Sequence, residues 1–473
     1  MRPITIFILY LLFCGLITLC MFIIQSQLAG VDYYRMKRMQ QLVYIEFAMF
    51  AGSIFLWRRL CQAFSQLYCP SSVAENGNFV LLPFGDRWRQ ICLADVCRSA
   101  VTLFLLLAHI SFMFYYTWVS SEPNFLALVS LAAVGLYLHL IVFVGFTEFW
   151  YHVGRLSRKH WLVESCGMKG CLTAFVRRRD QLTLWAFGIA VLLVLGGLHT
   201  TLNDPVITRV HIQTEHLPYN FTTPVKVALL TDIHIGPSVG KARIEKIVKM
   251  TNSLEPDVIA ISGDLADGFL LNLREAAQPL CNLRAKYGTF FATGNHEYMH
   301  GNVEEWFNFL RGCNITVLHN ENRHLSLGFN QSMCISGMDD LHAQRANVPG
   351  HGMNATRALA GCQSGEVLLA HQPNAARQVL RGGLGTDLDV ILSGHTHAGQ
   401  MYMFYPIVWI VNAYTRGLYF DHRTNTHVLV SAGVNYFGPP VKMFGTCEIM
   451  EIFLTPYGRF PPKKMEEPGP ILA

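Results

Sequence analysis

Apolar runs in the first 199 residues constrain the fold of this chain more than any other feature. Residues 4–24, 99–119 and 125–147 each offer the roughly 20 mostly apolar residues that a membrane-spanning helix needs. The run 182–198 is shorter but uncharged, and 42–57 is the weakest because it contains Glu46. The sequence therefore predicts a membrane region over residues 1–199 with about five transmembrane helices.

The first apolar run has an alternative interpretation as a secretory signal peptide. It is longer than the roughly 7–15 apolar residues of a signal-peptide core, and Gln27-Leu28-Ala29 is a poor cleavage site. We therefore favour a helix that is retained in the protein.

Lysine and arginine in the loops predict the orientation of the chain. The loop 148–181 holds seven of them and 58–98 holds five, whereas 120–124 holds none. Because such residues collect on the cytoplasmic side, the two basic loops are predicted to be cytoplasmic. Everything after 182–198 is then luminal or extracellular in a multi-pass membrane protein. The arginine run 177–179 is interpreted as a topology anchor, and no nucleic-acid partner is expected.

Three ionisable residues lie inside apolar runs, namely Glu46, His109 and His139. Intramembrane ionisable residues are candidates for function. Histidine near the end of a helix often serves only packing or interfacial polarity, and we favour that interpretation.

The second part of the chain has a different composition. Residues 1–199 carry 16 Lys or Arg against 9 Asp or Glu, whereas residues 200–473 carry 21 against 23. Fifteen of the 19 histidines lie from residue 199 onward. A basic, apolar membrane region is therefore joined to a histidine-rich domain of nearly balanced charge.

From residue 225 onward, short apolar runs alternate with helical patterns. The predicted strands are 225–230, 257–261, 287–292, 366–369, 388–392, 427–430 and 447–454, and the predicted helices are 241–254, 270–286, 302–311 and 373–380. This alternation is typical of βαβ units in an α/β domain. Functional loops in such sheets lie at the carboxyl ends of the strands.

Five predicted strand ends carry Asp, Asn or His. The segments are Asp-Ile-His (232–234), Gly-Asp-Leu-Ala-Asp (263–267), Gly-Asn-His-Glu (294–297), Ala-His (370–371) and Gly-His-Thr-His (394–397). Side chains alternate in extended backbone, so Asp-x-His and His-x-His each put two ligands on one side. One such motif is weak evidence, but five in succession predict a metal site. Nitrogen and oxygen ligands without thiolate suit Mn, Fe or Zn.

The order of these motifs resembles that of the calcineurin-like metallophosphoesterase superfamily. The resemblance covers about residues 206–455, within a domain predicted over 205–455 and followed by a tail at 456–473. The segment 394–400 is also similar to that of membrane-linked bacterial phosphoesterases of this superfamily, although Ala398 replaces a glycine. The resemblance implies a four-layer α/β/β/α sandwich with two divalent metal cations.

Carried over motif by motif, the resemblance implies seven metal ligands. The first ion would bind Asp232, His234 and His397, the second would bind Asn295, His371 and His395, and Asp264 would bridge both. His296 would be the catalytic residue that protonates the leaving group, while Asp267 and Glu297 would orient ligands from outside.

Such a site implies hydrolysis of a phosphoester by a hydroxide that the two ions share. The sequence thus predicts a membrane-anchored hydrolase, with a phosphodiesterase favoured and a lipid head group among the candidate substrates. The alternative is a non-catalytic metal-fold scaffold or a receptor-like membrane protein. A scaffold would be expected to lose ligands, and this chain retains all seven. The substrate, the metal and the oligomeric state are left open.

Two segments of the domain have uncertain roles. Relatives often carry an arginine near the C-terminal strand, where this chain has Lys442. If that arginine holds a phosphate, Lys442 could do so only as a point charge. The apolar segment 401–411 is too short to span a bilayer. It is either a buried strand or core segment, or a loop that dips into the membrane surface.

Sequons and cysteines bear on the outside placement. The glycosylation candidates Asn220, Asn314, Asn330 and Asn354 all follow the last apolar run. Five cysteines also follow it, at positions 281, 313, 334, 362 and 447. Buried thiols and disulfides both remain open, and two disulfides would leave one cysteine over.

Overall fold

The computed structural model describes residues 3–68, 84–117, 119–157, 178–214, 224–328, 331–362, 365–385 and 388–456. The chain divides into two compact units. Unit 1 comprises Met1–Gln40, Phe114–Leu128 and Gly197–Ala473, and unit 2 comprises Gln41–Met113 and Val129–Gly196. Unit 1 contains the α/β domain, and unit 2 contains most of the long apolar helices.

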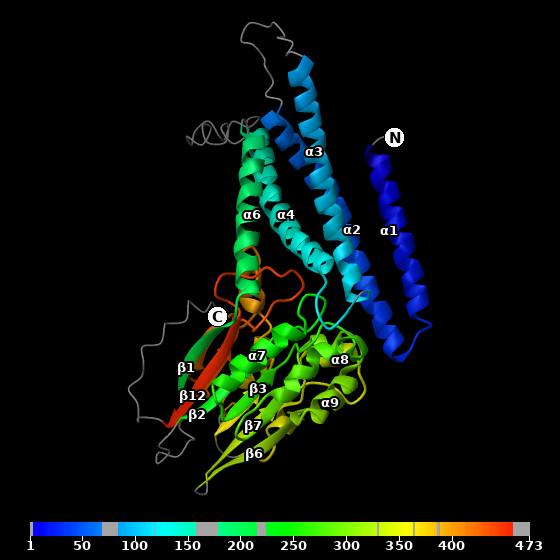
Figure 1. Cartoon of the computed structure of the whole chain (residues 1–473). Helices are drawn as coiled ribbons and strands as arrows, with labels where there is room; N and C mark the ends of the chain where they lie inside the picture. Colours follow the sequence, from blue (N-terminus) through cyan, green and yellow to red (C-terminus); the bar gives the residue numbers. More distant parts are fainter. Residues whose placement is uncertain are drawn as a thin grey trace. The chain divides into compact units, whose positions relative to one another are not determined.

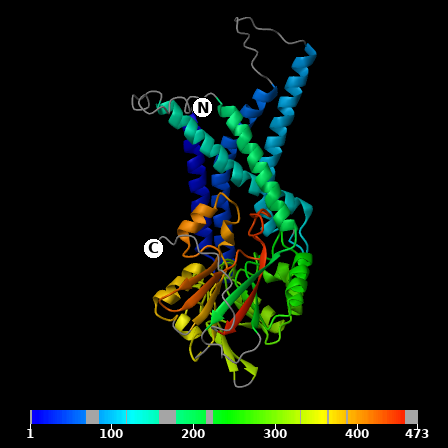
Figure 2. The same ribbon diagram turned by 90° about the vertical axis from the view of Figure 1, so that its left-hand side faces the viewer.

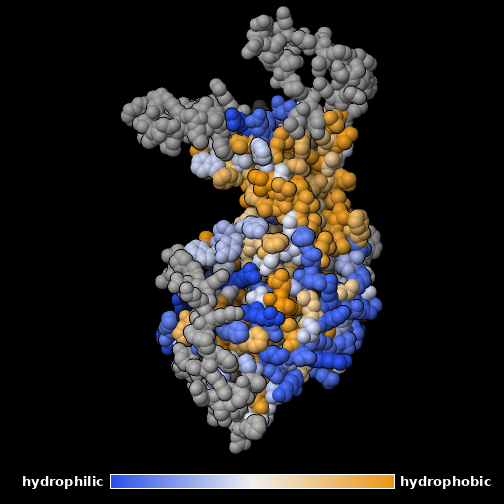
Figure 3. Space-filling view, turned by 60° about the vertical axis from the view of Figure 1, so that its left-hand side comes forward, coloured by the Kyte–Doolittle hydropathy of each residue, from blue (hydrophilic) through white to orange (hydrophobic). Residues whose placement is uncertain are grey.

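Within these described ranges, five helices are long and apolar enough to cross a membrane. They are α1 (Pro3–Gln25), α2 (Gly30–Tyr68), α3 (Phe84–Ile110), α4 (Phe125–Ser157) and α6 (Arg179–Leu202) (Figure 1). The predicted span 42–57 lies inside the single long helix α2. The predicted span 99–119 is interrupted, because α3 ends at Ile110 and a 3₁₀ turn, Ser111–Tyr115, follows. Apolar side chains gather over the long helices, and hydrophilic ones cover most of the α/β domain (Figure 3).

The ionisable residues inside the apolar helices have polar partners. Glu46 Oε2 lies 2.5 Å from His109 Nδ1, and His109 Nε2 lies 2.9 Å from the Ser53 hydroxyl. His139 Nδ1 lies 2.7 Å from the carbonyl oxygen of Gly135. Because an unpaired polar group in an apolar environment is costly, these contacts agree with a structural role for the three residues.

Two six-stranded sheets form the core of the α/β domain (Figures 1 and 2). The first has the order β1-β12-β2-β3-β4-β5, and its only antiparallel pair among the described strands is β12 with β2. Its strands are β1 (Val206–Thr214), β2 (Val225–Leu230), β3 (Val258–Ser262), β4 (Thr289–Ala292), β5 (Ile315–Val317) and β12 (Glu448–Pro456).

The second sheet has the order β10-β11-β9-β8-β7-β6. Its strands are β6 (Glu321–Gly328), β7 (Gln331–Gly337), β8 (Glu366–Leu369), β9 (Leu388–Ser393), β10 (Gly417–Asp421) and β11 (Thr426–Val430). The four central strands β11, β9, β8 and β7 run parallel. Parallel sheets are usually covered on both faces by other parts of the protein. The complete burial of β8 and β9 agrees with this.

Helices cover the outer face of each sheet. The helices α7 (Lys241–Ser253), α8 (Leu270–Ala277) and α9 (Val303–Gly312) pack on the first sheet, and α12 (Pro373–Arg381) packs on the second. In α7 the buried Ile244, Ile247 and Val248 recur at helical spacing on one face. Side chains of both sheets, such as Leu229 and Leu392, meet in the core between them. The predicted four-layer α/β/β/α sandwich is confirmed.

Two local predictions are wrong. The helix expected over 270–286 stops at Ala277, and a 3₁₀ turn over Gln278–Asn282 replaces its second half. Pro279 explains this break, because proline lacks the N–H that an α-helix needs and restricts the residue before it.

The segment 401–411 is not a buried strand, since its second part forms the helix α13 (Tyr405–Val411), in which no residue is buried.

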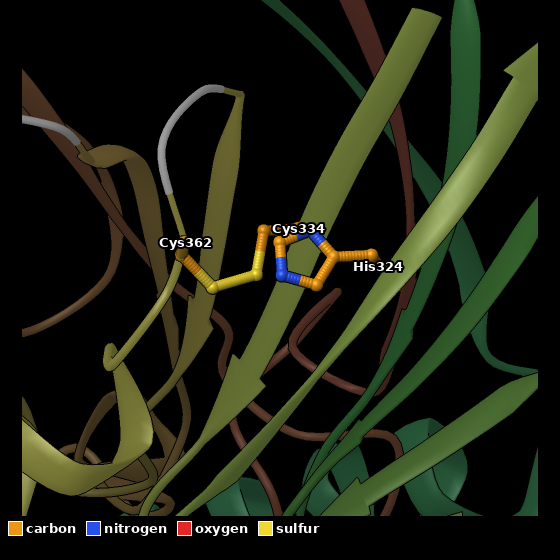
Figure 4. A group of neighbouring side chains, drawn as sticks. All are labelled: His324, Cys334 and Cys362. Carbon is orange, nitrogen blue, oxygen red and sulfur yellow. A yellow bond between two sulfur atoms is a disulfide. The ribbon is translucent and has the colours of Figure 1, made fainter.

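Two disulfides close loops in the α/β domain. Cys281 is bonded to Cys313, and Cys334 to Cys362, whereas Cys447 is a buried free thiol. The ring of His324 lies beside the second disulfide (Figure 4). The pairing was left open by the sequence and follows from which loops the fold brings together.

Candidate metal centre

The carboxyl ends of five parallel strands bring the predicted site residues together. The chain leaves β2 into Asp232 and His234, β3 into Asp264 and Asp267, β4 into Asn295, His296 and Glu297, β8 into His371, and β9 into His395 and His397. Parallel strands end at a common edge of a sheet. Because two sheets face each other, the loops of both contribute to one cluster of buried polar side chains.

Three of these residues form a first group of possible metal ligands. Nε2 of His397 lies 3.0 Å from Nε2 of His234 and 3.3 Å from Oδ1 of Asp232. All three side chains are buried. Ligand atoms on one tetrahedral ion are about 3.3 Å apart at usual metal–nitrogen distances, so this group has the dimensions of a metal site.

A second group lies around Asp264. Its Oδ2 is 3.1 Å from Nε2 of His371, and Nδ1 of His395 lies 2.8 Å from Oδ1 of Asn295. Nδ1 of His371 donates to the carbonyl oxygen of Ser262 at 2.8 Å, which turns Nε2 inward. That Nε2 is buried and makes no well-formed hydrogen bond, although Oδ2 of Asp264 lies beside it. An orphaned imidazole nitrogen whose other nitrogen is anchored is the arrangement that a bound metal requires.

The Asp264 carboxylate lies between the two groups. Oδ2 of Asp264 is 3.1 Å from Nε2 of His371 in the second group and 3.8 Å from Nε2 of His234 in the first. Its Oδ1 accepts the backbone N–H of His296 at 2.9 Å, which fixes the carboxylate. The side chain is therefore placed where one carboxylate can serve two ions.

Asp267 contacts two histidines through a single oxygen. Its Oδ1 lies 2.9 Å from Nδ1 of His234 and 2.6 Å from Nδ1 of His296. Both contacts leave Nε2 of each ring facing the centre, where each lies 3.8 Å from Asp264 Oδ2. Asp267 thus positions a predicted ligand and the predicted acid together.

Glu297 acts on the backbone of the site loops. Its carboxylate accepts the N–H groups of Asp264, Leu265 and Gly294 at 2.6–3.0 Å. Burial and the neighbouring Asp264 raise the pKa of Glu297. The side chain ties the loop after β3 to the loop after β4 and so fixes ligands on both.

Buried carboxylates and imidazoles perturb each other across the site. Burial favours a neutral ring, but the Asp267, Asp264 and Asp232 carboxylates outweigh it and raise the pKa of His234 to about 9. Burial lowers the pKa of His395 to about 4, which leaves that ring neutral near pH 7. Neighbouring histidines outweigh burial at Asp264 and hold its pKa well below the usual range. Without a metal, His234 is therefore protonated near pH 7 and partly balances the ionised carboxylates, and a divalent cation that displaces its proton can take over that role.

Backbone strain is concentrated at the predicted ligands. Five of the seven have a positive φ between 49° and 71°, namely Asp232, His234, Asp264, His395 and His397. Such conformations are unfavourable outside glycine and cluster at functional sites. Gly263 is required between them, because a Cβ there would lie 2.6 Å from the backbone of Gly294 and from Cγ of His371.

The loop after β11 is a part of the site that sequence reasoning missed. Gly433 has φ +86°, and a Cβ on it would lie 2.7 Å from Cβ of Asp232. Nδ2 of Asn435 donates to the carbonyl oxygen of Ile233 at 2.8 Å. The Phe437 ring lies 4.7 Å from the His296 ring, between centroids. The available signal was that this loop follows another predicted strand, 427–430, at the same edge.

Lys442 has a different role from the one considered above. Its Nζ donates to the carbonyl oxygens of Ala432, Gly433 and Asn435, and its side chain is fully buried. All three ammonium protons are therefore committed to the loop after β11. The idea that Lys442 holds a phosphate is wrong, because the residue stabilises the loop that packs on Asp232.

Two of the four glycosylation candidates can be located. Asn314 and Asn354 are exposed, as an acceptor of a glycan must be. Asn220 and Asn330 lie outside the described residues.

The chain is similar to known proteins over nearly its whole length. Residues 225–399 match the family model described as calcineurin-like phosphoesterase. A Caenorhabditis elegans protein named as a metallophosphoesterase is 43% identical over 462 residues, which cover 93% of this chain and 94% of that protein. The chain belongs to the calcineurin-like metallophosphoesterases.

Vertebrate relatives of this metallophosphoesterase include transmembrane proteins. The proteins named transmembrane protein with metallophosphoesterase domain are 34% identical in Danio rerio and 33% identical in Bos taurus. The matches cover 88% and 93% of this chain, and 89% and 95% of the relatives. Membership in this family implies a centre of two metal ions, which the two groups of Asp, Asn and His side chains described above fit.

Proposed function

We propose that this protein is a membrane-anchored, dinuclear-metal-dependent phosphoesterase, with phosphodiesters as the favoured substrate class. The observation that carries the proposal is the position of Asp264 Oδ2, 3.1 Å from His371 and 3.8 Å from His234. One ion would bind Asp232, His234 and His397, and the other Asn295, His371 and His395. Two such cations supply an activated water and neutralise the phosphoryl oxygens of the transition state.

His296 is the proposed general acid. Its Nδ1 contacts the ionised Asp267 at 2.6 Å, which holds the ring in one orientation and directs Nε2 toward the centre. A proton on Nε2 can then pass to the departing oxygen of the substrate. The Phe437 ring beside it limits the access of water to this proton.

Metal content and turnover of two variants test this mechanism. In the full-length protein, Asp264→Asn should lose both ions, whereas His296→Asn should keep them and lower the turnover of a phosphodiester by about 10²–10⁴-fold. Elemental analysis of the purified protein and release of the alcohol from a phosphodiester with an alkyl leaving group, which needs protonation, are the measurements. Equal turnover in His296→Asn and the natural protein would remove His296 from the mechanism.

We also propose that the substrate is the head group of a lipid. The helix α13 follows the loop that carries His397, has no charged residue and has no buried residue. Ile410 is 73% exposed, and Trp409 and Tyr405 are exposed as well. Aromatic and aliphatic side chains of this kind suit the interface between water and lipid. The same unit of the chain contains α1, a candidate membrane span, so a bilayer is the surface that α13 would meet.

A double substitution on α13 tests the lipid proposal. Trp409→Ser with Ile410→Ser should lower turnover of a lipid phosphodiester in vesicles and leave turnover of a soluble chromogenic diester unchanged. Leu271→Ser is the matched control, because Leu271 is 84% exposed on the separate helix α8. Equal loss on both substrates would contradict a membrane-contacting role for α13.

The proposed location of the active site is the lumen of an organelle or the cell exterior. Two disulfides support this proposal, because disulfides persist in oxidising compartments. The exposed sequons at Asn314 and Asn354 also support it. Treatment with a glycosidase should shift the mobility of the natural protein by more than that of the Asn314→Gln and Asn354→Gln variant, and equal shifts would contradict the use of these two sites.

A further inference from the structure

A second set of metal-ligating side chains lies outside the centre described above. Ligand atoms of His319, Asp339 and His351 all lie within 4.8 Å of one another. His319 follows β5, Asp339 follows β7, and His351 lies in the loop between the short helices α10 (His342–Ala346) and α11 (Ala355–Ala358). We propose that this His319–Asp339–His351 cluster binds one further divalent cation of the zinc class.

The two imidazoles approach opposite oxygens of one carboxylate. Nδ1 of His319 lies 2.7 Å from Oδ1 of Asp339, and Nδ1 of His351 lies 3.7 Å from Oδ2. These separations bracket the roughly 3.3 Å between two ligands of a tetrahedral ion. Two imidazoles and one carboxylate are also a common zinc donor set, which leaves a fourth position for water.

His351 has the hydrogen bonding of a metal-bound histidine. While Nδ1 faces Asp339, its Nε2 lies 3.0 Å from Oε1 of Glu304 in the first turn of α9. Metal-bound histidines usually donate their second N–H to a carboxylate, which fixes the tautomer and makes the other nitrogen a better ligand.

The surroundings of the cluster also suit a bound ion. The Asp339 side chain is fully buried, and that of His351 is 2% exposed. Oδ2 of Asp339 accepts the backbone N–H of Gly352 at 3.0 Å, which orients the carboxylate. Phe307 packs beside both imidazole rings. A rigid, partly dry setting of this kind strengthens the binding of a cation.

A neighbouring group of possible ligands does not qualify. His324 lies beside Cys334 and Cys362, but the two sulfurs are bonded to each other (Figure 4). Sulfur binds zinc as thiolate, and a disulfide has none.

The cluster is linked to the active-site loop through Tyr298. The Tyr298 hydroxyl lies 3.2 Å from Nδ1 of His351 and 3.1 Å from the hydroxyl of Thr293. Thr293 and Tyr298 flank the segment that carries Asn295 and His296. A cation on Nδ1 of His351 would compete with the Tyr298 hydroxyl for this nitrogen, so binding at the cluster would be felt by the loop of the proposed catalytic acid without any contact with substrate.

Counting metal ions in the full-length protein tests the proposal. After equilibration with zinc and gel filtration in detergent, His351→Ala should contain one equivalent less than the natural protein. Asp264→Asn should retain the equivalent at the cluster even if it loses those of the main centre. This design separates failure of the cluster from failure of the proposed catalytic centre. An unchanged metal count in His351→Ala would overturn the proposal.

A surface substitution keeps the test valid if His351→Ala does not fold. Glu304→Gln changes an exposed residue and should weaken binding of one zinc equivalent about 10–100-fold in a chelator competition. Glu305→Gln is the matched control, because Glu305 is the exposed neighbour in the same turn of α9. Equal zinc affinity in both variants and the natural protein would also overturn the proposal.

Discussion

The shared oxygen of Asp267 leads to a quantitative prediction for Asp267→Asn. In the natural protein, Oδ1 contacts Nδ1 of both His234 and His296, at 2.9 and 2.6 Å. The carboxylate is 5% exposed, so water screens its charge little. Asparagine keeps the shape and one oxygen but removes the charge.

The magnitude follows from the loss of charge at two contacts. A hydrogen bond to a charged group contributes about 1.5–3 kcal/mol, against about 0.5–1.5 kcal/mol for a neutral one. The hydrogen bond to His234 should therefore lose about 1–1.5 kcal/mol, or about tenfold in an equilibrium. The close ion-pair contact with His296 should lose a similar amount, or about tenfold in a rate. The loss at His234 should weaken binding of the first ion, and the loss at His296 should slow the step in which the leaving group departs.

Two assays separate these effects. Chelator competition should show about tenfold weaker binding of one ion. At saturating metal, turnover should fall about tenfold for an ester with an alkyl leaving group. It should fall less for p-nitrophenyl esters, whose leaving group needs little protonation. His296→Asn should share the leaving-group effect without the loss of metal. Natural metal affinity and unchanged leaving-group dependence in Asp267→Asn would refute the reasoning.

Three further predictions concern residues that support the site. Gly433→Ala should displace Asp232 and lower metal content, because its Cβ would lie 2.7 Å from that residue. Gly417→Ala is the control for positive φ without a clash, and equal metal content in the two variants would contradict the steric argument. Lys442→Met should lower the free energy of unfolding by about 3 kcal/mol or more, measured in denaturant, since three backbone carbonyls lose their donor. Burial lowers the pKa of His300 to about 3, so its neutral form stabilises the fold above pH 6.5 and this stability is lost as the pH falls. Between pH 7 and pH 5, this histidine should lower the free energy of unfolding by about 2 kcal/mol. His300→Phe should therefore reduce the difference in thermal stability between pH 7 and pH 5. An unchanged difference would contradict this role.

The sequence predicted the strands at the centre of the domain better than those at its edges. The apolar segments that became β2, β3, β8 and β9 were recognised because both faces of these strands are buried. The strands β1, β5, β6, β7 and β10 were missed. All of these except β7 lie at the edge of a sheet, and β1, β6 and β10 are only partly buried. Edge strands are defined by their pairing partners, and pairing is a long-range property.

The predicted metal ligands depended on a rule that the sequence carries locally. Polar motifs that directly follow buried strands must meet at one edge of a parallel sheet, whatever the connecting helices do. The same rule does not say which oxygen contacts which ring. Asp267 and Glu297 were both expected to orient ligands, yet one contacts two imidazoles and the other three backbone N–H groups.

The sequence by itself determined the apolar helices, the α/β class and the identity of the motif residues, because periodicity, length and strand-end position are local properties. Only the tertiary structure decided the disulfide partners, the burial of Lys442, the contact of Gly433 with Asp232 and the exposure of α13. It also brought His319, Asp339 and His351 together from three separate loops. These features depend on contacts between residues far apart in the chain, and such contacts are set by how the two sheets and their covering helices pack.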